Sequence, residues 1–148
     1  MRIEPYSDKY LYDVVKIVES FHIESVVEYD ATFDVTVVIQ TIQEQAKTNS
    51  NSAFLMIMED KCEGLIFGIQ TKSLINDNQM FNEIIWYVNK PFRQYGIKLL
   101  REVEKILKSR GVSTIIMAVM EYSKADKLKS FYTRLGFKAM ETHFVRSL

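Results

Sequence analysis

Arg93 and Gly96 stand three residues apart between an apolar segment and an amphipathic one, a spacing that suits the binding of an anion. Residues 84–88 (Ile-Ile-Trp-Tyr-Val) are typical of a buried strand, and 97–109 have the apolar periodicity of a helix. The first N–H groups of a helix lack internal partners, and its dipole places about half a positive charge there. A basic residue and a glycine at that point predict a phosphate or pyrophosphate site.

In this site the backbone amides of the turn would do most of the binding, so most of its side chains need not be special. The expected ligand-binding residues are Arg93, Gln94, Tyr95, Gly96, Ile97 and Lys98. The alternative is an ordinary connection between a strand and a helix, with no ligand.

Composition narrows the class of protein. The chain has 148 residues, is 47% hydrophobic and carries 19 basic and 19 acidic residues, so it is expected to fold, and a nucleic acid is not expected as its main ligand. With Cys62 as the one cysteine and two histidines, neither an internal disulfide nor a metal centre is expected. The longest apolar run, 115–120, is far below the roughly 20 residues of a membrane span. Without a signal-type N-terminus, a cytoplasmic protein is expected.

The chain is read as one domain over residues 1–148, because no linker, repeat or low-complexity stretch interrupts it. The order of elements predicts an α/β fold with a mixed central sheet and helices on both faces. Strands are expected at 2–5, 54–58, 65–71, 81–88 and 113–119, with two short ones within 137–145; helices are expected at 8–21, 35–47, 97–109 and 123–135. Gly111 and Gly136 are expected to end the last two helices.

Two segments resemble the GNAT superfamily of acyl-CoA-dependent N-acyltransferases, and the closest resemblance is to short GNAT proteins of bacteriophages. Arg93–Lys98 occupies the family's pyrophosphate signature, Arg/Gln-x-x-Gly-x-Gly/Ala, and Ser130–Phe137 is similar to the second hallmark, an aliphatic residue, Tyr, three residues, then Gly-Phe. The chain departs from the family at Lys98, where a small residue is usual, and at Ala125, where asparagine is frequent.

The resemblance implies direct transfer of an acetyl group from acetyl-CoA to a primary amine, without a metal. It places the pantetheine arm along 81–88, with Tyr87 and Val88 among the binding residues and the thioester near the N–H of Val88. Tyr132 would protonate the departing thiolate, and Phe131 would line the cofactor site. It also implies a homodimer formed through the second half of the sheet, and the host cytoplasm for a phage-encoded protein.

Glu83 is the natural candidate for the base that takes a proton from the amine, because it stands at the start of the central strand. A carboxylate near its ordinary pKa would need desolvation or a bridging water to do so at neutral pH. The alternatives are a solvated carboxylate at a strand end for Glu83, and a packed aromatic for Tyr132. At the level of the whole chain, a catalytically silent acyl-CoA-binding module and a protein-interaction module remain alternatives.

The acceptor is a small-molecule or protein amine in this interpretation. The segment 22–34 has a modestly acidic rim that suits a cationic amine, a protein lysine or a polyamine. Its acidic residues are Glu24, Glu28, Asp30 and Asp34.

Overall fold

The computed structural model describes residues 1–26, 32–48, 52–120, 125–144 and 146. They divide into two compact units, Met1–Ala118 and Val119–Leu148. The expectation of a single domain over 1–148 stays a prediction.

The first unit is built on a five-stranded sheet in the order β1-β2-β3-β4-β5. The first four strands pair antiparallel and β5 runs parallel to β4, which makes the sheet mixed, as expected. The strands are β1 (Arg2–Pro5), β2 (Ala53–Met58), β3 (Lys61–Lys72), β4 (Gln79–Val88) and β5 (Val112–Ile116).

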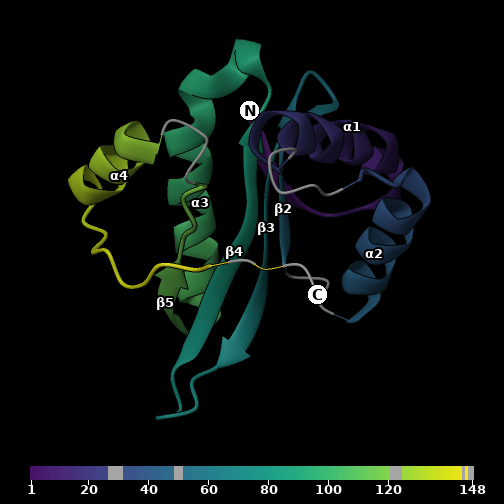
Figure 1. Cartoon of the computed structure of the whole chain (residues 1–148). Helices are drawn as coiled ribbons and strands as arrows, with labels where there is room; N and C mark the ends of the chain where they lie inside the picture. Colours follow the sequence, from purple (N-terminus) through teal and green to yellow (C-terminus); the bar gives the residue numbers. More distant parts are fainter. Residues whose placement is uncertain (27–31, 49–51, 121–124, 145, 147–148) are drawn as a thin grey trace. The chain divides into compact units, whose positions relative to one another are not determined.

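Helices cover both faces of this sheet, with α1 and α2 on one face and α3 on the other (Figure 1). A short 3-10 helix η1 (Asp8–Tyr10) leads into α1 (Leu11–Phe21), which continues as a π-helical segment η2 (His22–Val26); α2 is Val35–Thr48, and a 3-10 helix η4 (Lys90–Tyr95) precedes α3 (Gly96–Ser109). Gly111, with φ of +82°, ends α3 as expected.

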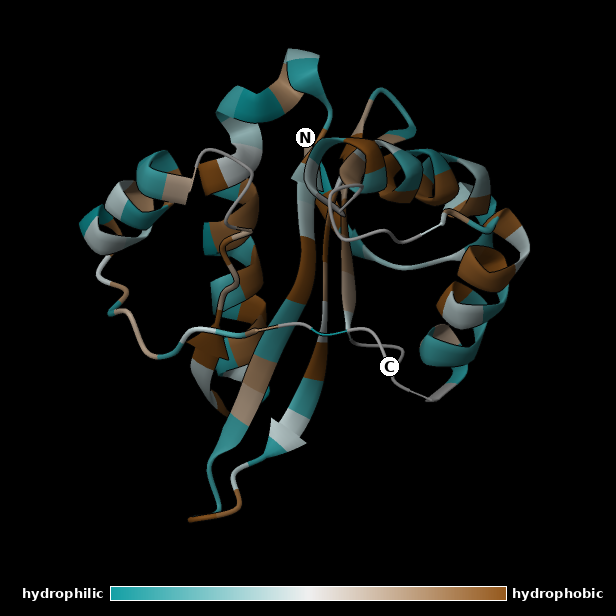
Figure 2. Cartoon of the chain, in the orientation of Figure 1, coloured by the Kyte–Doolittle hydropathy of each residue, from teal (hydrophilic) through white to brown (hydrophobic). Residues whose placement is uncertain are grey.

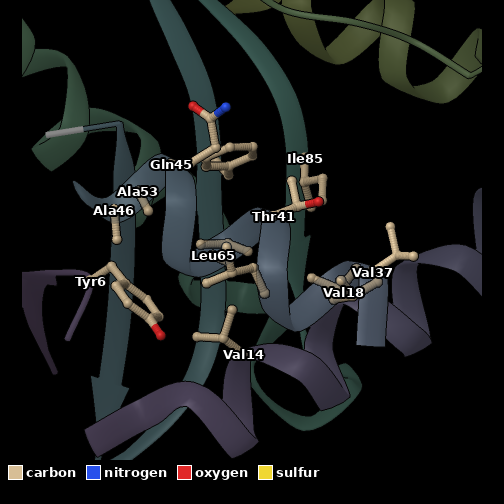
Figure 3. Close-up of a pocket in the computed structure, with 13 residues that line it drawn as sticks. Tyr6, Val14, Val18, Val37, Thr41, Gln45, Ala46, Ala53, Leu65 and Ile85 are labelled. Carbon is tan, nitrogen blue, oxygen red and sulfur yellow. The ribbon is translucent and has the colours of Figure 1, made fainter. Parts of the chain in front are cut away.

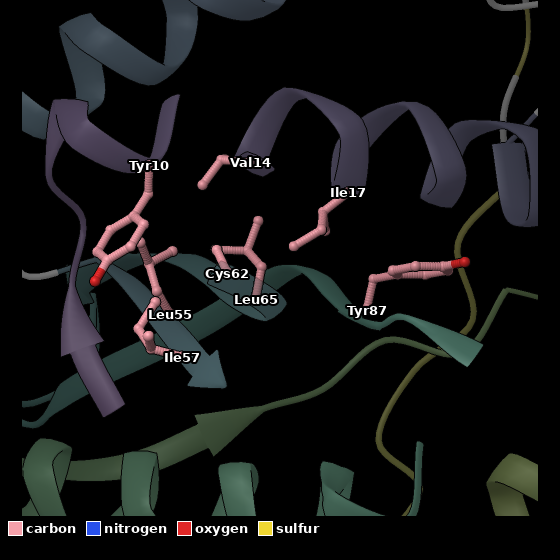
Figure 4. Close-up of a cluster of buried hydrophobic side chains, with 8 residues drawn as sticks. All are labelled: Tyr10, Val14, Ile17, Leu55, Ile57, Cys62, Leu65 and Tyr87. Atoms are coloured by element: carbon pink, nitrogen blue, oxygen red, sulfur yellow. The ribbon is translucent and has the colours of Figure 1, made fainter. Parts of the chain in front are cut away.

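A cluster of buried side chains joins α1 to the sheet (Figure 4). Val14 and Ile17 of α1 pack with Leu55, Leu65 and Tyr87 from the three central strands. Each such side chain contributes about 1.5–3 kcal/mol when it is removed from water. Figure 2 shows apolar residues in the middle of β3 and β4 and polar ones toward their connecting turn. The apolar middle of each strand is therefore the part that packs against the helices.

The connection between β2 and β3 is shorter than the six residues, 59–64, that separate the expected strands 54–58 and 65–71. Glu59 and Asp60 have φ of +47° and +63°, and two adjacent residues with positive φ are what a two-residue hairpin turn requires. Residues 61–64 therefore belong to β3. The strand expected at 113–119 ends earlier than expected: β5 ends at Ile116, where its pairing with β4 ends.

The second unit contains α4 (Ala125–Arg134), which Gly136 follows with φ of +90°. The helix was expected over 123–135, and residues 121–124 lie outside the described part of the chain. The two short strands expected within 137–145 are wrong for the described residues 137–144, because none of these residues pairs with a strand that could share its backbone hydrogen bonds.

A β-bulge interrupts the β3–β4 pairing between Phe67 and Gly68, where Phe67 pairs with Ile85 and Gly68 with Glu83. Residue 84 is thus the extra residue of β4. Gly68 is needed here, because a Cβ added to it would lie 2.3 Å from the carbonyl oxygen of Asn82.

We therefore expect Gly68→Ala to lower the free energy of unfolding by about 3 kcal/mol or more, since backbone atoms cannot yield as a flexible side chain can. Urea denaturation would measure it. Gly111→Ala is the matched control: its Cβ meets nothing within 4 Å, so only its positive φ costs stability, about 1–2 kcal/mol. Equal losses for the two variants would contradict the tight bulge.

Candidate functional site

The site begins where β4 and β5 separate. Their parallel pairing ends at Asn82 and Ile116, and the next residue of β4 is Glu83. The Glu83 carboxylate accepts a hydrogen bond from the backbone N–H of Ala118 over 2.9 Å. A side chain therefore replaces the backbone pairing at the point of divergence, and the bulge at residue 84 follows immediately.

Glu83 is protonated more readily than an ordinary glutamate. Burial raises its pKa from 4.5 to about 7, and the hydrogen bond from Ala118 opposes only part of this rise. A carboxyl group with a pKa near neutrality can accept a proton at physiological pH and release it again. Burial thus supplies the desolvation that a carboxylate needs to act as a base at neutral pH.

The expected strand 81–88 and helix 97–109 are joined by a 3-10 helix, η4. Pro91 lies in its first turn, where the fixed φ of proline favours a helical start. Gly96 has φ of −56° and is the first residue of α3, so its backbone needs no glycine. A Cβ at this position would lie 3.6 Å from Trp86 and 3.8 Å from Val88, which is ordinary contact. The helix start is thus present as expected, but it follows directly on η4, and the N–H of Gly96 donates to the carbonyl oxygen of Arg93.

Three cationic residues lie in η4 and in the first turn of α3: Lys90, Arg93 and Lys98. Lys98 is exposed, so the lysine at the family's small-residue position points to solvent. The Arg93 Nε donates to the carbonyl oxygen of Val88 over 3.3 Å, and its guanidinium lies 5.6 Å from the Tyr87 ring centroid. Arg93 is therefore fixed against the end of β4.

Glu24 of η2 pairs with two of these cationic residues, Lys90 and Arg93. It accepts hydrogen bonds from the Tyr87 hydroxyl over 2.8 Å and from Arg93, and the Lys90 Nζ lies 3.3 Å away. Burial alone would raise the pKa of Glu24, but these three donors hold it below its ordinary value. Glu24 therefore stays ionised and ties the segment after α1 to the β4–α3 connection.

The rest of the predicted acidic rim has other roles or is not described. Asp34 caps α2, since its Oδ1 accepts from the N–H groups of Thr36 over 2.8 Å and Val37 over 3.2 Å. Glu28 and Asp30 lie outside the described residues. The sequence predicts Glu24 only as part of the acceptor rim; its pairing with Arg93, 69 residues away in the chain, arises from the fold.

Tyr132 and Phe131 belong to the second unit. The Tyr132 ring lies 5.3 Å from that of Phe137 and 5.8 Å from that of Phe131, centroid to centroid. The Tyr132 carbonyl accepts from the N–H groups of Leu135 and Phe137, each over 3.0 Å. Within this unit, the second hallmark therefore forms the C-terminal end of α4, where the Tyr132 ring packs against the rings of Phe131 and Phe137.

Cys62 is unsuited to covalent catalysis. Burial raises the pKa of its thiol to about 12, and the Sγ donates to the carbonyl oxygen of Gly64 over 3.4 Å. It therefore stays a thiol, which is a weak nucleophile. Among the described residues no group of three or more His, Cys, Asp or Glu side chains could hold a metal ion, and no helix is long and apolar enough to cross a membrane.

Comparison with solved structures identifies the architecture. A protein from Clostridium difficile described as a possible acetyltransferase matches with a TM-score of 0.79 at 14% identity, over 99% of this chain and 96% of the other. A transcriptional regulator from Bacillus halodurans matches with 0.79 at 17%, over 99% of both chains. An aminoglycoside antibiotic 6′-N-acetyltransferase from Acinetobacter haemolyticus matches with 0.72 at 15%, over 100% and 98%.

No protein-family model matches the chain, and no curated protein matches it by sequence. The architecture is that of a mixed α/β protein whose structural neighbours include named acetyltransferases. More narrowly, the chain has the fold of the GNAT-type acetyltransferases, which confirms the fold expected from its sequence.

Proposed function

We propose that this protein is an N-acyltransferase that moves an acetyl group from acetyl-CoA to a primary amine. The observation that carries the proposal is the Glu83 carboxyl, with a pKa of about 7, at the point where β4 and β5 separate. Acetyltransferases among the structural neighbours support the same reaction class.

The start of α3 suits the pyrophosphate of the donor. A helix N-terminus favours an anion, and the three positive charges of Lys90, Arg93 and Lys98 exceed the one negative charge of Glu24, which pairs with the first two. Arg93 is held by Glu24, and its Nε also donates to Val88, so its guanidinium is already oriented. The fit rests on these charges and on the helix end together.

The expected position of the thioester near Val88 is too distant from Glu83 for the chemistry. Val88 follows Glu83 by five positions in β4, and at a rise of about 3.3 Å per residue their Cα atoms are about 16 Å apart. A base must lie within hydrogen-bond reach of its proton, directly or through one water. We therefore place the thioester carbonyl beside the bulge at Ile84 and Ile85, one or two residues from Glu83.

The chemistry is then a direct displacement. The carboxylate of Glu83 takes a proton from the amine, directly or through water, and the nitrogen forms a bond to the thioester carbon. The C–S bond breaks as the tetrahedral adduct collapses, and Tyr132 gives its hydroxyl proton to the sulfur. An amide and a thiol leave, and both side chains regain their initial states by proton exchange with water.

Transfer of radiolabel from acetyl-CoA to a panel of amines tests the proposal. We expect labelled amide with at least one amine class. Binding of acetyl-CoA without transfer to any amine would contradict the enzyme and favour the silent module. Absence of binding would contradict the donor site as well.

Tyr132→Phe is expected to lower kcat by about 10–100-fold and to leave the Kd for acetyl-CoA nearly unchanged. The effect is modest for a general acid because a thiolate is a good leaving group that needs only a weak donor. Steady-state kinetics and a calorimetric titration would measure both quantities. A collapse of affinity instead would assign Tyr132 to binding rather than to proton transfer.

A further inference from the structure

Glu24 places a negative charge among the cations that the donor's pyrophosphate needs. Its carboxylate pairs with Lys90 and Arg93, the two cationic residues of η4. In the described part of the chain it is the one carboxylate that forms an ion pair with either of them. The Tyr87 hydroxyl donates a further hydrogen bond to it over 2.8 Å. Two of the three cations at the donor site are therefore already paired with an anion of the protein itself.

The two cations remain accessible to a ligand from solvent. The side chains of Lys90 and Arg93 are 72% and 45% exposed, and that of Glu24 is 30% exposed. Ion pairs between groups this exposed are weak, because water and salt screen them. A pyrophosphate is the stronger partner, since it carries more than one negative charge and its oxygens match the guanidinium in pairs. It can therefore exchange with the carboxylate.

Arg93 connects the two faces of β4 at the point where this strand ends. Ile85 lines an apolar cavity between α1, α2 and the sheet (Figure 3), and Tyr87, two residues further along β4, faces the same side. The Arg93 guanidinium lies over the Tyr87 ring, and its Nε donates to the carbonyl oxygen of Val88. The Val88 side chain faces Gly96 of α3 on the other side. Because β4 ends at Val88, no strand backbone separates the guanidinium from the helix start.

Glu24 has two opposite effects on an anion that binds here. It helps to hold the Arg93 guanidinium, which favours binding, and its charge repels the anion, which opposes binding. The first effect is small, because Arg93 keeps its hydrogen bond to Val88 and its place over the Tyr87 ring without Glu24. In water, one charge about 6 Å from a doubly charged group changes binding by roughly tenfold. The repulsion therefore prevails.

We propose that Glu24 competes with the pyrophosphate of the donor for Lys90 and Arg93, and that it thereby lowers the affinity of the site for acetyl-CoA and for the product CoA. The inference rests on the donor site of the proposed function. Donor binding replaces the carboxylate by phosphate oxygens at the two cations, and departure of CoA restores the ion pairs. Glu24 thus favours the release of CoA after the transfer.

Glu24→Gln tests the competition. Glutamine keeps the size of the side chain, and its amide oxygen can still accept from the Tyr87 hydroxyl, but it carries no charge. We expect the Kd for CoA and for acetyl-CoA to fall about tenfold in calorimetric titrations. A merely structural Glu24 would give an equal or higher Kd in Glu24→Gln, and that result would overturn the proposal.

Two further variants separate the charge of Glu24 from other causes. Asp77→Asn removes a carboxylate paired with Lys72 near the opposite end of β4, about 30 Å away along the strand, and should leave the Kd unchanged. Glu24→Asp keeps the charge and should keep the Kd close to that of the wild type. If Glu24→Asp tightens binding as much as Glu24→Gln, the charge is not the cause and the proposal is wrong.

Fragments of the cofactor identify the group with which Glu24 competes. Inorganic pyrophosphate should show the same gain in affinity in Glu24→Gln as CoA does, because it carries the charges that the carboxylate repels. Pantetheine, which has no phosphate, should show none. A gain for pantetheine, or none for pyrophosphate, would overturn the competition.

These titrations also distinguish this inference from the proposed function. Tighter binding of CoA by Glu24→Gln without acyl transfer to any amine would contradict the enzyme and leave the competition standing. Equal binding of CoA by the wild type and Glu24→Gln would contradict the competition alone. If neither protein binds CoA or pyrophosphate, the donor site is wrong and the competition is wrong with it.

Discussion

Glu83→Gln is expected to lower kcat/KM for acyl transfer by about 10²–10⁴-fold, the usual contribution of a general base. Glutamine keeps the size of the side chain, and its amide oxygen can still accept from the N–H of Ala118. It cannot take a proton from the amine. The loss should therefore fall on the chemical step, which pre-steady-state kinetics with a saturating donor would measure.

The pH profile gives the same prediction a second measurement. The base must be deprotonated, and its pKa is about 7, so the wild-type kcat/KM should rise with pH through about 7 and then level off. Glu83→Gln should lose this limb. Glu102→Gln, which changes an exposed carboxylate paired with Lys105 on α3, is the control and should keep the limb. If kcat/KM of Glu83→Gln still rises with pH through about 7, the group that titrates is not Glu83.

The stability of the fold should fall as the pH rises, whereas kcat/KM should increase. The pKa of Glu83 is raised in the folded state, from 4.5 to about 7, so between these values the folded protein holds a proton that the unfolded chain has released. The contribution of this group to stability is therefore full below about pH 4.5 and is lost as the pH rises to 7. Chemical denaturation at several pH values should show this decline in the wild type and not in Glu83→Gln.

Local patterns in the sequence were enough to predict most elements of the fold. The helix α3 follows from its apolar periodicity, and Gly111 marks its end because the chain adopts a positive φ there. The proposed donor site was predicted for the same reason, since its strand, its basic residue and its helix start are neighbours in the chain. Such features need no knowledge of tertiary contacts.

Features that depend on distant segments were missed. The bulge opposite Gly68 arises from the pairing of β3 with β4, and nothing in either strand alone specifies the extra residue. The pairing of Glu24 with Arg93 joins residues that only the fold brings together. The raised pKa of Glu83 likewise depends on its burial in the folded protein, and the sequence alone does not reveal how buried this side chain is.

Gly96→Asp is expected to weaken acetyl-CoA binding by about 100-fold or more, because like charges placed side by side cost several kcal/mol. The new carboxylate would stand at the first residue of α3, where its charge would occupy the same positive helix end that the pyrophosphate needs. The fold should tolerate the change: the φ of −56° suits any residue, and the added Cβ meets Trp86 and Val88 only at ordinary contact distances.

Gly96→Ala separates charge from bulk in this experiment. It adds the same Cβ without the carboxylate and improves the helix propensity of the position, so its stability should equal or exceed that of the wild type. If both variants lose affinity in calorimetric titrations, the donor needs the space above Gly96 rather than the charge of the helix end. If Gly96→Asp binds acetyl-CoA like the wild type while it remains folded, the pyrophosphate does not lie at the start of α3.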